Sequence, residues 1–534
     1  MPATSTAAPP ISPRARTVAL LVILLAAFMD LMDVTILYVV LPSIQTDLRA
    51  GPSAVEWMSS GYTLALALGL IIGARAGDRL GHKRVFLAGM AGFVVASALC
   101  GASVTPGMLV FARVLQGLFA AAMVPQVLSQ IQLMYTPAER GPAMATYSAL
   151  VPLAAAMGTV LGPVLVVWDL AGAGWRLVFF VNVLVGLVAM PVAWRLLPEA
   201  RATHAARLDL AGVGISTAGL LLLLYPLITA ADRPQWPGWA TASVIAGLAV
   251  LAGFVVHQRR LASRGGDPLL RIGLLAIRSL SGGLVVQLLF LAAIIGFFLV
   301  FMQFLQLGLG YGPLAAGLTL LPWSVVVAVM AGLSAAVLLP RFGRLTVQAG
   351  LVLNAAGFAL LAVTATSATP STGWAALLPG ILVGAVGMGL ATSPLAVLPL
   401  TDLEPADAGT GSGLFNTTSH LGAAIGVAVI GTVFFAGLRP PDATTAVQTA
   451  TPARHVGDAF AMSLWLGIGL LVTALAAGFL LPRHYRPDHA EPETPKSRNR
   501  ATQRHERVTH GLNWYRIVLV GLGPGLVIGP GIRG

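Results

Sequence analysis

Residues Val18 to Pro42 read VALLVILLAAFMDLMDVTILYVVLP, an apolar run with two acids near its centre. At about 1.5 Å per residue, a helix of this length crosses a hydrocarbon core of about 30 Å. Asp30 and Asp33 are three residues apart, so they share one side of that helix, one turn from each other. An Asp at the bilayer centre costs about 2.5–3.5 kcal/mol on insertion scales, and the run holds no Arg or Lys to pair with it.

Two carboxylates this close in a low-dielectric site disfavour joint ionisation. At least one of them is therefore expected to hold or exchange a proton near working pH, which makes the pair a candidate proton carrier. The alternative is that one Asp only faces a water-filled lumen or bonds a neighbouring helix.

The composition predicts a polytopic membrane protein. Hydrophobic residues make up 57% of the chain and charged residues 10%, which is too little charge to cover a soluble globule of 534 residues. The net charge of +12 lies in short loops and a tail, so it reflects topology better than nucleic-acid binding. The single cysteine, Cys100, can form no intrachain disulfide, and the first apolar run is expected to be retained as a span because no cleavage site follows it.

Apolar runs of about 20 residues predict fourteen spans. They are expected to start near Val18, Ala54, Val85, Gly107, Pro142, Leu177, Leu208, Gly238, Gly283, Leu314, Thr346, Trp374, Gly411 and Ala459. An even number puts both termini on one side. The segments on that side, without the C-terminal tail, hold 17 Lys and Arg against 5 on the other, so the positive-inside rule predicts cytoplasmic termini.

A weak internal repeat relates the first six spans to the last six. Arg79 and Gly81 follow the second span, and Arg341 and Gly343 occupy the equivalent place in the second half. Duplicated halves around a midplane site are typical of secondary transporters. The expected organisation is a cytoplasmic N-terminal tail at 1–17, a six-helix half at 18–197, two inserted helices at 198–257, a cytoplasmic linker at 258–282, a second six-helix half at 283–481 and a disordered cytoplasmic tail at 482–534.

Four motifs then occur in a familiar order. They are MDVTILYVVLP at Met32–Pro42, GARAGDRLGHKR from Gly73 to Arg84, RVLQG at Arg113–Gly117 and GTVLGP at Gly158–Pro163, the last followed by WRLVFFVNVLVG at Trp175–Gly186. From about Phe28 to Leu481 the sequence resembles the fourteen-span drug:proton antiporters of the major facilitator superfamily. The resemblance implies an all-α integral membrane bundle of about 14 helices, in two pseudo-symmetric halves plus two inserted helices.

The chain departs from the family pattern at a few positions. Tyr38 stands where the family usually has Asn, Val166 and Val167 where a glycine pair is usual, and Leu184 where Pro is usual. Asp30 is an additional acid. These departures concern substrate and proton stoichiometry, not the fold class.

Arg113 is the one basic residue that the sequence places inside a span. A buried guanidinium needs a partner, and Asp30 and Asp33 are the acids at comparable depth, so a charge relay between the first and fourth spans is expected. The alternative is a static structural ion pair.

The family resemblance implies two further roles. The loop after the second span would be a conformational latch, formed by Gly73, Asp78, Arg79, Gly81, Lys83 and Arg84, unless its charges are simply solvated. The fifth helix would bend and pack through the antiporter motif of Gly158, Gly162 and Pro163, for which packing alone is the alternative.

Polar residues inside other spans are candidates for a substrate cavity, and each is equally compatible with bonding between helices. The candidates are Gln126, Gln130, Gln303, Asn354, Asn416 and His420, with Gln287 and Gln306 beside them. No Walker A loop, metal-ligand cluster or nucleophile elbow is present, so no cofactor or metal and no catalytic residue is expected.

The sequence thus predicts a monomeric, proton-coupled exporter of lipophilic or cationic drugs in the bacterial plasma membrane. Protons, the bilayer and a small-molecule substrate are its expected partners. Proton-coupled uptake, narrow export of one metabolite, and a non-transporting receptor or scaffold are the alternatives, and a membrane enzyme has no supporting constellation.

Overall fold

The computed structural model describes residues 12–136, 139–200, 209–230, 237–404, 407–438 and 453–483. The chain divides into two units, Met1–Tyr485 and Arg486–Gly534, and every described residue belongs to the first. The predicted disordered tail at 482–534 therefore lies, apart from its first two residues, outside the described part of the chain.

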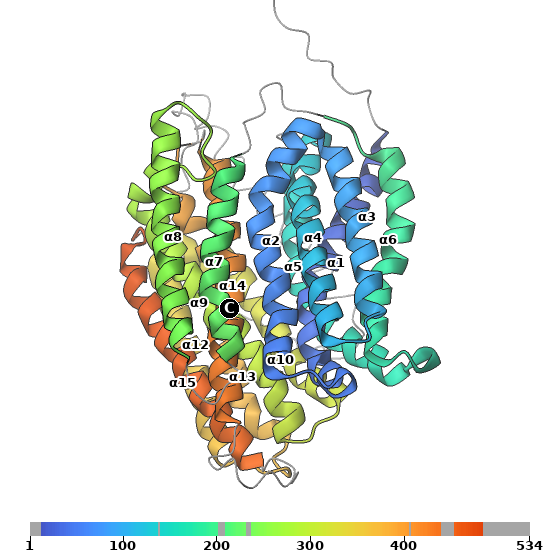
Figure 1. Ribbon diagram of the computed structural model, residues 1–534, viewed down its shortest axis with the longest axis vertical. Coiled ribbons are helices and arrows are strands. Elements are labelled where there is room, and N and C mark those ends of the chain that lie inside the picture. Colours follow the sequence, from blue (N-terminus) through green and yellow to red (C-terminus); the bar gives the residue numbers. More distant parts are fainter. Residues whose placement is uncertain are drawn as a thin grey trace, which may run out of the picture. The chain divides into compact units, whose positions relative to one another are not determined.

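The described residues form a helical bundle without a strand (Figure 1). The N-terminal half holds α1 (Pro13–Leu48), α2 (Pro52–Leu80), α3 (His82–Gly101), α4 (Pro106–Met134), α5 (Arg140–Trp168) and α6 (Leu177–Leu196). Two helices follow, α7 (Leu210–Ala230) and α8 (Gly238–Ser263). The C-terminal half holds α9 (Arg278–Gln303), α10 (Pro313–Leu333), α11 (Leu339–Phe342), α12 (Arg344–Thr366), α13 (Trp374–Val397), α14 (Ala408–Gly437) and α15 (Ala453–Ala477).

Local sequence signals place many of these helix ends. Proline occupies the first helical position of α1, α2, α4 and α10, where its missing N–H leaves no hydrogen bond unmade. The side chains of Ser12 and Thr105 cap α1 and α4 by accepting from backbone N–H groups. Gly81 and Gly343, the two glycines of the predicted repeat, separate α2 from α3 and α11 from α12 at φ values of 106° and 53°. Both turns of the repeat thus place a glycine at positive φ, although their ψ values of 131° and −126° differ.

Thirteen helices of the described chain are long and apolar enough to cross a membrane. The fourteenth long helix is α5, whose apolar described stretch is Ala156–Trp168. All fourteen begin within six residues of the starts that hydropathy predicts. The protein is therefore a multi-pass membrane protein, as the sequence predicts.

The two halves share one pattern of helix packing. In the first, α1 packs on α5 and α6, α2 on α4, and α3 on α4 and α6; in the second, α9 packs on α14 and α15, α10 on α13, and α12 on α13 and α15. Between the halves, α2 packs on α14 and α5 on α10, which are again equivalent pairs. Two six-helix units related by pseudo-symmetry account for this pattern.

The inserted helices lie against the junction of the halves. Helix α7 packs on α8, α14 and α2, and Figure 1 shows it between α8 and α2. Asp209, just before α7, ties the pair together by accepting from Gly212 N at 2.8 Å, from Gln258 Nε2 at 2.7 Å and from His257 Nε2 at 3.0 Å. Burial alone would raise the pKa of the Asp209 carboxyl, but these three bonds outweigh it and hold the pKa below its ordinary value.

The halves touch at one end of the bundle. We call the end at which α1 begins the inner end and the opposite end the outer end. Gln303 Nε2 donates to Gln45 Oε1 at 3.2 Å and Gln306 Nε2 to the carbonyl of Val39 at 2.8 Å, both on the outer half of α1. Thr432 of α14 lies 3.4 Å from Glu56, near the outer end of α2.

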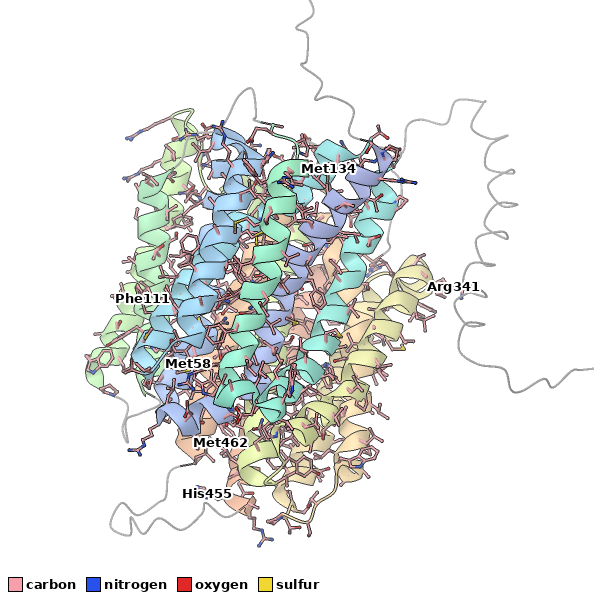
Figure 2. The ribbon with its side chains drawn as sticks, turned by 90° about the vertical axis from the view of Figure 1, so that its right-hand side faces the viewer. Met58, Phe111, Met134, Arg341, His455 and Met462 are labelled. Carbon is pink, nitrogen blue, oxygen red and sulfur yellow. The ribbon has the colours of Figure 1, made fainter. Side chains whose placement is uncertain are left out.

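The inner ends of the halves stand apart. Met134 and Arg341 mark the inner ends of α4 and α11, and Figure 2 shows them well separated. The described contacts between the halves therefore form an outer seam.

Candidate functional site

The site is centred on Asp33, in the middle of α1. Its side chain is fully buried, and Arg113 of α4 is 1% exposed. Arg113 Nη1 forms an ion pair with Asp33 Oδ2. The structure therefore brings together an acid of α1 and the base of α4 that the sequence predicts to interact. The acid that pairs with Arg113 is Asp33, not Asp30.

Two amides complete the shell around Asp33. Gln116 Nε2, one turn after Arg113 on α4, donates to Asp33 Oδ1 at 2.9 Å. Asn182 Nδ2 of α6 donates to the same oxygen at 2.9 Å. Both amides are buried, so three donors from two helices hold a carboxylate that is fully buried in this conformation.

The guanidinium of Arg113 is equally well satisfied. Its Nε donates to the carbonyl of Met58 on α2 at 3.1 Å, and its Nη1 also donates to Gln116 Oε1 at 2.6 Å. The group lies 4.2 Å from the centre of the Tyr62 ring, within cation–π range. Arg113 therefore links α1, α2 and α4, and a change in its position would alter its contacts with all three helices.

Asp30 lies one turn nearer the inner end and is 4% exposed. Its Oδ1 accepts a hydrogen bond from the hydroxyl of Tyr62, and the ring of Tyr62 forms the cation–π contact with Arg113. The two acids are thus connected through Tyr62 and Arg113 together, and they occupy different environments. Asp33 is held by a cation and two amides, whereas the bond described for Asp30 comes from a neutral hydroxyl.

Sequence reasoning missed Tyr62, Gln116 and Asn182 as members of this site. A signal existed for two of them, because Gln116 lies inside RVLQG and Asn182 inside WRLVFFVNVLVG. Tyr62 carries no such signal, since a tyrosine in an apolar helix is usually a packing residue. The helix pairing decides which polar groups meet.

The predicted antiporter-motif helix packs directly against the Asp33 segment. A Cβ added at Gly158 would lie 2.0 Å from Thr35 Oγ1, and one at Gly162 would lie 2.7 Å from Ile36. On the other side of α5, a Cβ at Gly317 of α10 would lie 2.6 Å from Pro163. The outer half of α5 is therefore fitted between α1 and the C-terminal half, where it can transmit a shift of one to the other.

The ion pairs of the predicted latch residues lie inside the N-terminal half, whereas Arg75 of the same segment donates to the carbonyls of Asp267 and Pro268 in the linker between α8 and α9. Asp78 lies 3.6 Å from His82, and Arg84 lies 3.5 Å from Glu199, just after α6. A Cβ at Gly81 would lie 2.1 Å from that same Glu199 carboxylate, so this turn requires glycine.

The remaining latch residues differ in exposure. Gly73 is buried against α4 and accepts from Gln126 Nε2 at 2.8 Å, whereas Arg79 is exposed and Lys83 is half-buried. The loop is therefore anchored to α4 and α6 and, through Arg75, to the linker before α9, whereas Arg79 stays exposed.

Most of the predicted cavity amides hold helices together in this structure. Gln126 joins α4 to Gly73 and His82, Gln130 donates to Pro198 O, and Asn354 donates to Gly384 O at 2.9 Å. Gln303 and Gln306 lie in the outer seam, and Gln287 donates to Ser419. These bonds correspond to the alternative of helix–helix contact for six of the eight candidates.

The last two candidates lie on α14. Asn416 is exposed and donates to Ser412 on its own helix, and His420 is half-buried. Among the described residues, no group of three or more His, Cys, Asp or Glu is arranged to hold a metal ion.

Comparison with known proteins gives the family. The model of the Major Facilitator Superfamily matches residues 23–427. A probable actinorhodin transporter of Streptomyces coelicolor is 41% identical, over 83% of this chain and 76% of that protein. The puromycin resistance protein of Streptomyces alboniger is 34% identical over 86% and 90%, and a multidrug efflux pump of Mycolicibacterium smegmatis is 32% identical over 85% and 88%.

The fold has a counterpart among solved structures. A bacterial homologue of the human lysosomal transporter Spinster, solved inward-facing and unoccupied, superposes with a TM-score of 0.61. The match is 16% identical and covers 89% of this chain and 100% of that chain, which establishes a common fold alone. Because the family model spans most of the chain and the relatives match over most of their own length, the protein is a member of the Major Facilitator Superfamily, as its sequence motifs predict.

Proposed function

We propose that the protein is a proton-coupled antiporter that exports lipophilic or cationic antibiotics and drugs across the bacterial plasma membrane. The observation that carries this proposal is the buried Asp33–Arg113 pair with Asp30 one turn away. An ionisable network at mid-membrane depth costs folding energy, and in transport proteins such networks serve proton or ion coupling. The relatives named as an actinorhodin transporter, a puromycin resistance protein and a multidrug efflux pump support antibiotics as the substrate class.

The orientation follows from charge. Because the Lys and Arg residues are concentrated in the loops at the inner end, the positive-inside rule makes that end cytoplasmic. The outer seam then faces the outside, and the conformation described here is inward-facing. In this conformation substrate would enter from the cytoplasm or the inner leaflet while the outside stays closed.

The cycle uses the ion pair as its coupling element. A proton arriving from outside neutralises Asp33, which weakens its attraction to Arg113 and frees α4 and α1 to move relative to each other. Release of that proton to the cytoplasm restores the pair and accompanies outward movement of the substrate. Asp30, nearer the inner end, acts as a second carboxylate that helps proton exchange or senses substrate charge.

The packing of α5 supports the mechanical part of the cycle. Its outer half separates the Asp33 segment of α1 from α10, so a change at Asp33 reaches the interface between the halves through Gly158 and Gly162. The loop from Gly73 to Arg84 would engage the C-terminal half when the inner end closes. A single polypeptide contains all of these parts, and we propose a monomer.

The test is efflux of ethidium, a fluorescent lipophilic cation, from energised cells that express wild type or Asp33→Asn. Export that needs the proton gradient and is lost in Asp33→Asn supports the antiporter. Export that survives both collapse of the gradient and the substitution overturns the coupling mechanism.

Gradient-driven accumulation of the dye, in place of export, would favour the uptake alternative. The matched control is Asn354→Leu, which removes a buried amide from the C-terminal half and should leave the gradient dependence unchanged.

A further inference from the structure

Asn182 and Gln116 both bond Asp33, but they differ in what their amide oxygens contact. Both donate from their amide nitrogens to Asp33 Oδ1, as they must while Asp33 is a carboxylate, because a carboxylate only accepts. The carbonyl oxygen of Asn182 is buried and has no hydrogen-bond partner among the residues that the structure describes. The amide is therefore free to exchange its two ends without giving up a second bond.

Gln116 cannot make this exchange. Its Oε1 accepts from Arg113 Nη1 at 2.6 Å and from the Cys100 thiol at 3.6 Å. Its Nε2 also donates to Ser97 Oγ at 2.9 Å. Reversing this amide would point an NH2 group at the guanidinium and break the bond to it.

Protonation of Asp33 changes what its neighbours must supply. Oδ2 holds Arg113, so the free position for a proton is Oδ1. A protonated Oδ1 carries an O–H donor, and it then faces two amide NH2 donors and no acceptor. A buried donor without an acceptor is costly, so some neighbour must turn.

We propose that Asn182 is a positioning residue that reverses its amide each time Asp33 gains or loses its proton. A proton from water bonds to Asp33 Oδ1, the amide of Asn182 rotates by about 180°, and the new O–H donates to Asn182 Oδ1. Loss of the proton to water reverses both changes. This inference rests on the proposed function, because it assumes that Asp33 is the group that is protonated.

The groups that face Asp33 from the surrounding helices leave Asn182 as the acceptor. Arg113 of α4 is a cation, and the Tyr62 hydroxyl of α2 is used by Asp30 of the same helix as Asp33. The Cys100 thiol of α3 is directed to Gln116. From α5, Gly158 and Gly162 contact Thr35 and Ile36 beside Asp33 and carry no titratable group, and the α5 tyrosine that interacts electrostatically with this pair of acids, Tyr147, does so with Asp30.

The chain offers a matched control for Asn182. Asn354 of α12 is also fully buried, donates one hydrogen bond through Nδ2 to Gly384 O, and has a carbonyl oxygen without a partner in the described part of the chain. Its partner is a backbone carbonyl, which does not titrate. Substituting Asn354 therefore removes the same chemical group without touching a proton site.

The test is infrared difference spectroscopy of the purified full-length protein in nanodiscs while the pH is lowered stepwise. The carboxylic C=O band that disappears in Asp33→Asn belongs to Asp33. Hydrogen bonding lowers the frequency of this band, so in Asn182→Leu, which is nearly isosteric and has no acceptor, the band should move to higher frequency. It should stay in place in Asn354→Leu. Ethidium efflux should fall about tenfold in Asn182→Leu, as expected for one lost buried hydrogen bond.

An Asp33 band at the wild-type frequency in Asn182→Leu would overturn the inference while leaving the antiporter proposal intact. A pH difference spectrum without any Asp33-dependent band would overturn both, because Asp33 would then not titrate. Should Asn182→Leu fail to fold, Asn182→Ala removes the same acceptor from a smaller side chain and is subject to the same two outcomes.

Discussion

Replacing Arg113 by Met leaves the carboxylate of Asp33 without its cation. Met keeps much of the length of the arginine stem but carries no charge and no donor. The bonds to Met58 O and Gln116 Oε1 are lost with it, and Asp33 remains fully buried. The free energy of unfolding should fall substantially, because a buried charge without a partner is poorly tolerated.

Two routes give the size of this loss. Breaking a buried ion pair by removing one partner costs about 3–5 kcal/mol. The alternative for the variant is to protonate Asp33, which at pH 7 costs about 4 kcal/mol relative to an unfolded Asp that ordinarily ionises near pH 4. The second route becomes cheaper by about 1.4 kcal/mol for each unit that the pH falls. We therefore expect a loss of about 3–4 kcal/mol at pH 7 and about 1–2 kcal/mol at pH 5.

The measurement is reversible unfolding in mixed micelles, followed by circular dichroism at pH 7 and pH 5. The control is Arg176→Met, which breaks a pair with Asp47 whose side chains are 28% and 48% exposed and should cost about 1 kcal/mol or less. Adding Asp33→Asn to Arg113→Met should recover most of the stability. A loss below about 1 kcal/mol at pH 7, or an equal loss at both pH values, would refute the reasoning that a buried charge sets the cost.

Two further outcomes are expected. Gly158→Ala should separate α5 from α1 at Thr35, destabilise the protein by about 1–3 kcal/mol and abolish ethidium efflux. The control is Gly107→Ala, whose added Cβ has no atom within 4 Å and should change neither property. Equal thermal stability of the two variants would contradict the packing argument. The folded-state pKa of Asp209 is lowered, so its stabilising contribution is present above the ordinary carboxyl pKa and is lost as the pH falls through the lowered value. In a pH titration, acid should therefore narrow the difference in the free energy of unfolding between wild type and Asp209→Asn. A difference that widens in acid would show that the sign is wrong.

The sequence predicted most of the fold because its signals are local. A helix in a bilayer must satisfy its own backbone hydrogen bonds, so an apolar run of sufficient length is enough to place it. Proline and glycine mark the ends of the runs, and the repeated turns at Gly81 and Gly343 reveal the duplication. Hydropathy does not give the pairing of α2 with α14, nor the position of α7 beside them, since these depend on the shapes of surfaces that are distant in sequence.

The candidate site was predictable in part, for a related reason. Charge in an apolar run is rare and expensive, so Asp30, Asp33 and Arg113 stand out, and the need of a buried guanidinium for a partner correctly joins α4 to α1. Amides are cheaper to bury and therefore less informative. Gln126 and Asn354, which are candidates for substrate contact, bond neighbouring helices in this conformation, whereas Asn182, which was not a candidate, reaches Asp33.

By itself, the sequence determined that this protein crosses the membrane many times, that it is built from two related halves, and that acids and a base lie within its spans. Length, hydropathy and the cost of a charge in hydrocarbon are properties of single segments, which explains why no tertiary information was needed for these conclusions. Only the tertiary structure decided that Arg113 pairs with Asp33, that Tyr62 contacts both Asp30 and Arg113, and that the halves meet at the outer seam. Those contacts join residues up to hundreds of positions apart, and they follow from how the helices pack against one another.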